Sequence, residues 1–276
     1  MLRDLLTRFP LNYHSEWKVG TLDLTEQLLL TLMKLHLNVK KLHLSTDFNV
    51  STATVTNVFI TIVSALRDIL FVGCMRTAIP SRAKNASCAP ICFRDFPNCR
   101  MVIDCTEISV DRADNLKQRC TTYSHYKGTT TFKALIGVAP CGLITFVSDV
   151  YGRSKSDKDI VQDCGVFNIL SAGDMLMADK GFNIRHILPS GVTLNIPSFL
   201  YNGQFTHDEV INNWNIASAR IHVERAIKRI KFFTILDHIP ASLRNQADKI
   251  FKVCACLTNF QTPILSEVAT MFSFPQ

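Results

Sequence analysis

Three acidic residues stand in contexts that suit phosphate chemistry. Asp104 ends the apolar run Met-Val-Ile, Asp179 follows Met-Leu-Met-Ala, and Glu224 lies in a strongly basic segment. An isolated carboxylate is costly to bury, so acids at the ends of buried strands usually converge on a cation or on one another. Carboxylate oxygens without His or Cys select hard ions. The pattern therefore predicts a Mg²⁺ or Mn²⁺ centre that acts on a phosphate substrate.

Alternating and apolar runs predict the strands and helices that must position these acids. Strands are expected at 100–110, 129–138, 143–150, 174–178 and 193–196, and helices at 156–169, 207–213, 216–233 and 244–259. A strand meander followed by alternating helices and strands predicts a mixed sheet covered by helices. Acids at the carboxyl ends of strands in such sheets lie where ligands usually bind.

Each acid also has a purely structural interpretation. Arg220, Glu224 and Lys228 have the i, i+4 spacing of a salt-bridge ladder, and Asp at a strand end is a common cap. Three other acids compete for the site, namely Glu107, Asp149 and Asp157. Glu107 lies three residues beyond Asp104, which places it on the opposite face of the same strand. All three competitors are expected to have supporting roles.

The N-terminal part is predicted to be helical, because 23–70 contains neither Pro nor Gly. Apolar spacing indicates helices at 24–35, 39–47 and 51–66, in the order of a helix-turn-helix unit. The residues expected to be exposed at the start of the third helix, where they could reach DNA bases or phosphates, are Ser51, Thr52, Thr54 and Asn57. The alternative is a three-helix bundle used for packing or dimerisation, which the lack of Lys and Arg between 49 and 66 favours.

Composition gives weaker indications. The 276 residues carry a net charge of +7 with a pI near 8.9, which favours a polyanionic partner such as nucleic acid. The N-terminus lacks the pattern of a signal peptide, and no apolar run reaches the length of a membrane span. Four of the ten cysteines, at 88, 92, 99 and 105, lack the paired spacings of common zinc modules, so reduced thiols in an intracellular setting are expected.

Several motifs together resemble a DDE superfamily endonuclease, of the transposase-derived group related to Harbinger elements. They are Ile-Asp-Cys-Thr-Glu-Ile at 103–108, Tyr-Ser-His-Tyr-Lys at 123–127, Tyr-Gly-Arg at 151–153 with Ser-Asp-Lys at 156–158, Ala-Asp-Lys-Gly-Phe-Asn-Ile at 178–184, and Arg-Ile-His-Val-Glu-Arg at 220–225. The resemblance extends in order from about 96 to 265. The segment 21–70 also resembles the helix-turn-helix that precedes this nuclease in many members.

The resemblance implies an α/β, RNase H-like fold: a mixed five-stranded sheet with helices on both faces, preceded by a small all-α helix-turn-helix unit. The expected organisation is an irregular N-terminus at 1–20, the helix-turn-helix at 21–70, a linker at 71–98, the nuclease domain at 99–266 and a tail at 267–276. The family's catalytic, metal-binding acids fall on Asp104, Asp179 and Glu224, and Asp157 matches a structural or accessory acid. All three catalytic positions keep an acid.

The implied activity is a two-metal nuclease that cuts DNA and is able to join the freed end to a target. The side chains expected to hold DNA phosphates in the nuclease domain are Lys127, Lys133, Arg225, Lys228, Arg229 and Lys231. A DNA substrate implies a nuclear address. Because the chain starts close to the helix-turn-helix, a separate DNA-binding partner protein is expected to supply end recognition, and self-association stays open.

Two other functions compete with this one. The first is a domesticated, non-catalytic DNA-binding protein that keeps the transposase fold, and the second is a metal-dependent RNA nuclease on the same fold.

Overall fold

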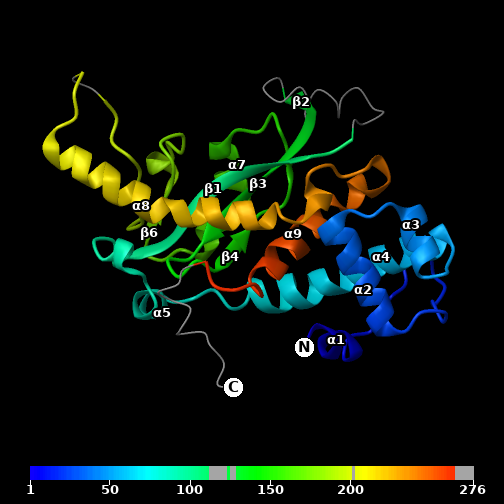
Figure 1. The fold of residues 1–276 in the computed structure, drawn as a ribbon. Coiled ribbons are helices and arrows are strands. Elements are labelled where there is room, and N and C mark those ends of the chain that lie inside the picture. The colour runs from blue at the N-terminus through cyan, green and yellow to red at the C-terminus, as the bar shows by residue number, and fades with distance from the viewer. Residues whose placement is uncertain (112–122, 125–128, 201–202, 265–276) are drawn as a thin grey trace.

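The computed structural model describes residues 1–111, 123–124, 129–200 and 203–264, and Figure 1 shows how their helices and strands are arranged. The N-terminal part is helical, and a mixed sheet with helices on both faces follows it. This α/β architecture confirms the predicted fold class. Residues 1–20 were expected to be irregular, but they contain a short helix, α1 (Leu2–Thr7).

The three predicted N-terminal helices are present. They are α2 (Leu24–Leu37), α3 (Lys41–Asp47) and α4 (Thr52–Leu66). A capping box starts α2, in which Asp23 accepts from the backbone N–H of Glu26 and the Glu26 carboxylate accepts from the backbone N–H of Asp23, both at 2.7 Å. The helix ends at Asn38, which adopts the left-handed conformation with φ 49°. Ser51 caps α4 as predicted, because its hydroxyl accepts from the backbone N–H of Thr54 at 3.0 Å.

Helix α4 does not stop where the helix-turn-helix was expected to end. It runs directly into a π-helical segment, η1 (Arg67–Met75), which packs against the last helix, α9 (Ala247–Thr258). The predicted boundary at residue 70 therefore lies inside a continuous helix. The rest of the predicted linker contains α5 (Arg82–Ser87) and the 3₁₀ turn η2 (Ile91–Phe93).

The joined helix Thr52–Met75 is long and apolar enough to cross a membrane by length and composition alone. Most of its apolar window is buried inside the protein, where Val58, Ile62 and Leu66 are fully covered. These features are those of a core helix, which explains its apolar character without a bilayer.

The sheet is built around β1 (Cys99–Ser109). On one side β1 pairs antiparallel with β3 (Thr129–Val138), and on the other it pairs parallel with β6 (Met175–Met177), which is followed by parallel β7 (Thr193–Asn195). The free edge of β3 pairs along its length with β4 (Ile144–Val147), β5 (Tyr151–Gly152) and β2 (Tyr123–Ser124). Because these three short strands share one edge, the described strands occupy the five positions of the predicted mixed sheet.

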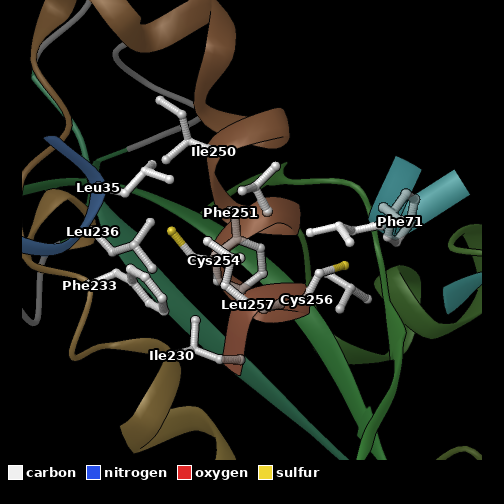
Figure 2. Packing of buried hydrophobic residues seen from close by; sticks show 14 of the residues in the cluster. Leu35, Phe71, Ile230, Phe233, Leu236, Ile250, Phe251, Cys254, Cys256 and Leu257 are labelled. Carbon is white, nitrogen blue, oxygen red and sulfur yellow. The ribbon is translucent and has the colours of Figure 1, made fainter. Parts of the chain in front are cut away.

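The two faces of the sheet carry different helices. Alternate residues of β1 face opposite sides, so Val102 packs in one cluster with α8 (His207–Ile230), α9 and α4, while Ile103 packs in the other near α7 (Asp157–Asp163). The first cluster also contains residues of α2 and η1, so the helical unit and the sheet share one core. Figure 2 shows this contact, with Leu35 and Phe71 near Phe251.

Helix α8 is one element rather than the two predicted segments at 207–213 and 216–233. Thr206 and Glu209 form its capping box, and no Pro or Gly interrupts the 24 residues. Two asparagines at the predicted break weaken the local helical signal, but each is held by a contact outside the helix. A single rigid helix therefore carries Glu224 across the sheet (Figure 1).

Candidate active site

Asp104 and Asp179 lie just past the end of the pairing between the neighbouring parallel strands β1 and β6. Asp179 follows the last residue of β6, as expected, whereas Asp104 lies in the middle of β1, which continues to Ser109, so its expected place at a strand end is wrong. Val102 pairs with Met177 in the β1–β6 register, and the two acids each lie two residues further along the chain. Residues two apart on a strand face the same side, so both carboxylates point toward the face that packs under α8. Two acids 75 positions apart in the sequence are thus brought together, as the strand pattern predicted.

The carboxyl group of Asp104 is half-buried, and its environment disfavours the charged form. Burial is the main cause that raises the pKa of Asp104 from 3.8 to about 6, and the negative charges of Asp179 and Asp157 add to it. The backbone N–H of Cys105, which donates to Asp104 Oδ1 at 2.8 Å, and the charge of Arg220 act in the opposite direction. Asp104 therefore lies in a negative site that a further cation would stabilise.

Arg220 on α8 connects the other two acids. Its Nη1 lies 3.0 Å from Asp179 Oδ1, and its Nη2 lies 3.9 Å from Glu224 Oε1. The Arg220 side chain is only 12% exposed, whereas the two carboxylates are 53% and 59% exposed. The i, i+4 pair with Glu224 predicted from the sequence is present at the long limit of an ion pair, but the closer contact crosses from the helix to the end of β6. Sequence reasoning missed this role.

The donor set fits a hard divalent cation, although the side chains are not gathered around one point. In the part of the chain that the structure describes, no three His, Cys, Asp or Glu side chains lie close enough to hold an ion. The guanidinium of Arg220 contacts two of the acids, and its charge offsets part of the rise in the pKa of the third, Asp104. All available ligands are carboxylate oxygens, the chemistry that Mg²⁺ and Mn²⁺ prefer.

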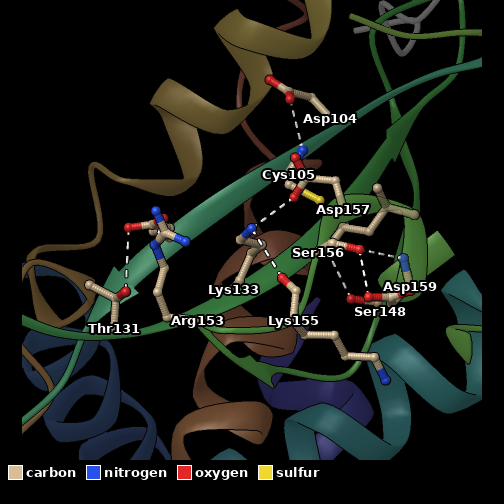
Figure 3. Close-up of polar contacts among 12 residues, drawn as sticks. Asp104, Cys105, Thr131, Lys133, Ser148, Arg153, Lys155, Ser156, Asp157 and Asp159 are labelled. Carbon is tan, nitrogen blue, oxygen red and sulfur yellow. Dashed lines mark hydrogen bonds and ion pairs between the residues drawn. The ribbon is translucent and has the colours of Figure 1, made fainter. Parts of the chain in front are cut away.

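A second polar cluster lies on the other side of β1 (Figure 3). Lys133 donates to Asp157 Oδ1 at 2.9 Å and to the carbonyl oxygen of Lys155 at 3.3 Å. Lys133 is 9% exposed, so the prediction that it holds DNA phosphates is wrong. Burial raises the pKa of the neighbouring Cys105 thiol far above its usual range, and the charge of Asp157 contributes. The contact between Lys133 on β3 and Asp157 on α7 holds this helix against the sheet.

The other competing acids also have structural partners. Glu107 lies on the face opposite Asp104, as predicted, where Arg153 Nε approaches its carboxylate at 2.5 Å and Thr131 donates to it at 3.3 Å. Asp149 forms an ion pair with the buried ammonium of Lys252. Their contacts explain both residues without a catalytic role.

The remaining cations predicted to hold DNA differ in exposure. Arg225 and Lys228 are exposed on α8, and Lys231 is exposed at the end of that helix. Arg229 is half-buried and donates to the carbonyl oxygens of Thr262 and Pro263. The predicted Lys127 lies outside the described residues.

Two of the four residues predicted to face DNA at the start of α4 are buried. Thr54 is 8% exposed and its hydroxyl bonds to that of Ser51 at 2.9 Å. Asn57 is 0% exposed, because its side chain accepts from the backbone N–H of Ser15 and donates to the carbonyl of Trp17. The predicted exposure of Thr54 and Asn57 is therefore wrong. Ser51 and Thr52 are exposed.

The burial of Asn57 gives a first prediction. Replacing Asn57 with Ala leaves two backbone groups of the N-terminal segment unsatisfied, which should lower the free energy of unfolding by about 1–3 kcal/mol. The neighbouring exposed change Thr52→Ala is the matched control and should stay within about 0.5 kcal/mol of the parent. Urea unfolding measures both, and a neutral Asn57→Ala would contradict the structural role.

Comparison with known protein families agrees with this geometry. A family model described as DDE superfamily endonuclease matches residues 103–259, and a model described as helix-turn-helix of DDE superfamily endonuclease matches residues 20–71. The search of curated proteins finds no match. The first match begins within β1 and covers the segments that carry all three acids, over more than half of the sequence. The chain therefore belongs to the DDE superfamily endonucleases, with the helix-turn-helix of that superfamily at its N-terminus.

Proposed function

We propose that this chain is a divalent-metal-dependent DNA endonuclease, related to transposases, whose catalytic and metal-binding residues are Asp104, Asp179 and Glu224. The single observation that carries the proposal is that the β1–β6 pairing brings Asp104 and Asp179 together on the face covered by the helix that holds the third acid. The three carboxylates would hold two Mg²⁺ or Mn²⁺ ions, which would supply activation of the attacking oxygen and stabilisation of the leaving oxygen of the phosphodiester.

The chain's own residues have distinct tasks in this proposal. Asp104, the most buried of the three acids, fixes the position of the site on rigid β1, and Glu224 approaches from α8. Arg220 holds Asp179 in place before the cations bind, and its guanidinium is then free to contact the DNA phosphate. Exposed Arg225 and Lys228 bind neighbouring phosphates, so affinity should fall steeply with salt.

The same site accommodates a second step. A 3′-hydroxyl freed by the first cut can serve as the nucleophile in place of water, which joins the DNA end to another strand. Because DNA is the proposed substrate, we place the protein in the nucleus. A separate DNA-binding partner and a homo-oligomer remain further proposals.

The direct test is nicking of supercoiled plasmid DNA by the purified full chain. We expect nicking with Mg²⁺ or Mn²⁺ and none with excess EDTA or with Ca²⁺ alone. Duplex RNA of the same length tests the proposed preference for DNA. Failure to nick in either metal, or faster cutting of the RNA, would count against the proposal.

Cation binding itself should be visible without DNA. An ion bound only by the folded state stabilises it by mass action, so about 5 mM Mn²⁺ should raise the thermal midpoint by about 2–5 °C. Glu224→Gln should reduce this shift while leaving the midpoint without metal unchanged, because Glu224 is 59% exposed and only loosely paired. Differential scanning fluorimetry measures both values.

One observation favours a second function. Arg220 neutralises two of the acids without a metal, which gives them a structural use in a non-catalytic DNA-binding protein that keeps the transposase fold. Such a protein would bind DNA through its helix-turn-helix and would show neither nicking nor the Mn²⁺-dependent rise in the thermal midpoint.

A further inference from the structure

An exposed tryptophan, Trp214, lies in the N-terminal third of α8. Trp214 is 70% exposed, more than any other large apolar side chain described except Ile91. An indole ring is among the costliest side chains to leave in water, and large exposed aromatics are typical of binding surfaces. The exposure of Trp214 therefore needs a physical reason.

Contacts on both sides of Trp214 fix its direction. Asn213 accepts from the backbone N–H of Ser198 at 2.7 Å, and Asn215 donates to Asp95 at 3.1 Å. Ile216, two residues on and nearly opposite on the helix, is fully buried. The helix cannot rotate to bring the indole into the core without breaking these contacts. Trp214 is thus held outward by the fold.

Trp214 belongs to a line of exposed side chains along α8, which also includes Val210, and we call four of them the outer stripe of α8. Its members are Trp214, Ile221, Arg225 and Lys228. Spacings of 7 and 11 residues place the first three within about 20° of one direction, and Lys228 lies about 40° from Trp214. Apolar surface at one end of the stripe therefore gives way to positive charge at the other.

The stripe borders the candidate active site. Glu224 lies about 80° around the helix from Trp214, on the side that turns toward Arg220, and about 15 Å along the axis. At roughly 3.4 Å per nucleotide, this distance corresponds to four or five stacked nucleotides. A DNA strand that passes Glu224 can thus reach the indole within a few nucleotides.

We propose that the outer stripe of α8 binds an unpaired DNA strand beside the cleavage site, with Trp214 stacking on a base and Arg225 and Lys228 contacting phosphates. Aromatic faces combined with cations along one path are the features that bind single strands independently of sequence. DNA is favoured over a protein partner because the cations of the stripe, Arg225 and Lys228, lie beside Glu224 of the candidate active site, whose proposed substrate is DNA. The inference rests on the proposed function only in taking DNA as the ligand.

The chain offers a built-in reporter for this contact. It contains two tryptophans, Trp17 and Trp214, so Trp17→Phe leaves Trp214 as the only indole. In EDTA, which prevents cutting, a duplex with a five-nucleotide single-stranded extension should quench the fluorescence of this variant, whereas the same duplex with blunt ends should quench it much less. The matched variant Trp214→Phe, which retains Trp17, should show no difference between the two DNAs.

Affinity provides the second readout. Trp214→Ala should weaken binding of the extended duplex by about tenfold or more and leave binding of the blunt duplex nearly unchanged, and Trp214→Phe should retain most of the affinity. Because the side chain is exposed, the thermal midpoint of both variants should match that of the parent.

The outcomes separate this inference from the proposed nuclease. If the extended duplex quenches selectively but the protein never nicks DNA, strand binding by the outer stripe is supported and the proposed nuclease activity is contradicted. If the protein nicks DNA without selective quenching, the nuclease activity is supported and strand binding by the outer stripe is contradicted. Equal affinity of Trp214→Ala and the parent for the extended duplex overturns the inference. It is also overturned if Trp214→Ala changes the sedimentation coefficient of the free protein and leaves DNA affinity unchanged, because the stripe is then an interface between copies of the chain.

Discussion

Replacing Asp104 with Asn is expected to lower the rate of Mg²⁺-dependent DNA nicking by at least about 10²–10³-fold. Asparagine has nearly the same shape and can still accept the hydrogen bond from the backbone N–H of Cys105. It lacks the negative charge that a divalent cation requires from the most buried ligand of the site. Loss of activity in a correctly folded variant would therefore report on charge alone.

The same variant should be more stable than the parent when no metal is present. The pKa of Asp104 is raised from 3.8 to about 6, so the folded state binds its proton more tightly than the unfolded state does. The parent therefore loses stability as the pH rises from about 4 to about 6, by up to about 3 kcal/mol and less after solvent screening. Asp104→Asn does not undergo this loss, because asparagine does not titrate. In EDTA, the thermal midpoint of the parent should therefore fall below that of Asp104→Asn as the pH rises above 4, and the difference should stay constant above 6.

A remote carboxylate supplies the control for both measurements. Asp163, which ends α7 on the opposite face, is 58% exposed, so Asp163→Asn should nick DNA at the parental rate. If Asp104→Asn nicks DNA at more than about a tenth of the parental rate, Asp104 is not a catalytic residue. A lower thermal midpoint for Asp104→Asn in EDTA at pH 7.5 would show instead that the charge stabilises the fold.

Asp104 and Asp179 could be located from the sequence because the relevant signal is local. Each follows an apolar run, and the pairing of two buried parallel strands brings them together, although β1 continues past Asp104 to Ser109. Arg220 carried no comparable signal. Its spacing to Glu224 suggested a surface ladder, whereas its closest partner, Asp179, lies 41 positions away. A contact between a helix and a sheet depends on how the two elements pack in three dimensions. The sequence of the helix alone therefore does not predict it.

The incorrect assignments share a physical cause. Thr54, Asn57 and Lys133 are polar, so they were expected at the surface, but each is buried with partners. Asn57 satisfies backbone groups about 40 positions earlier in the chain, and Lys133 meets Asp157 through the fold of the sheet. A buried polar residue with a distant partner looks like an exposed one in sequence alone.

The family match for the helix-turn-helix ends at residue 71, close to the predicted boundary at 70, but the helix itself continues past that point. Residues 71–98 contain three prolines and several cysteines and show little periodicity, which predicted a linker. The first of them nevertheless continue α4 as η1, because Leu70 and Phe71 are buried against α9. Tertiary burial, rather than local propensity, extends the helix. The shared core that results has a testable consequence for folding.

Phe251→Ala is expected to lower the free energy of unfolding by about 3–5 kcal/mol, through lost burial and the cavity that remains. Phe251 is 1% exposed on α9 and lies in the cluster that also contains residues of α2, α4, η1 and α8 (Figure 2). Since that cluster joins the helix-turn-helix to the sheet, both parts should lose stability together. Urea unfolding should therefore show one transition in the parent and one, at lower urea, in the variant.

The two tryptophans make this coupling measurable. Trp17 precedes α2 and Trp214 lies on α8, so the single-tryptophan variants Trp17→Phe and Trp214→Phe report on different parts of the fold. With Phe251→Ala added, both reporters should show the same shift of the urea midpoint. Phe260→Ala is the control, because Phe260 follows the same helix but is 49% exposed, and it should cost less than about 1 kcal/mol. A shift seen by Trp214 but not by Trp17 would mean that the helix-turn-helix unfolds independently, and that the core drawn in Figure 2 does not couple it to the nuclease sheet.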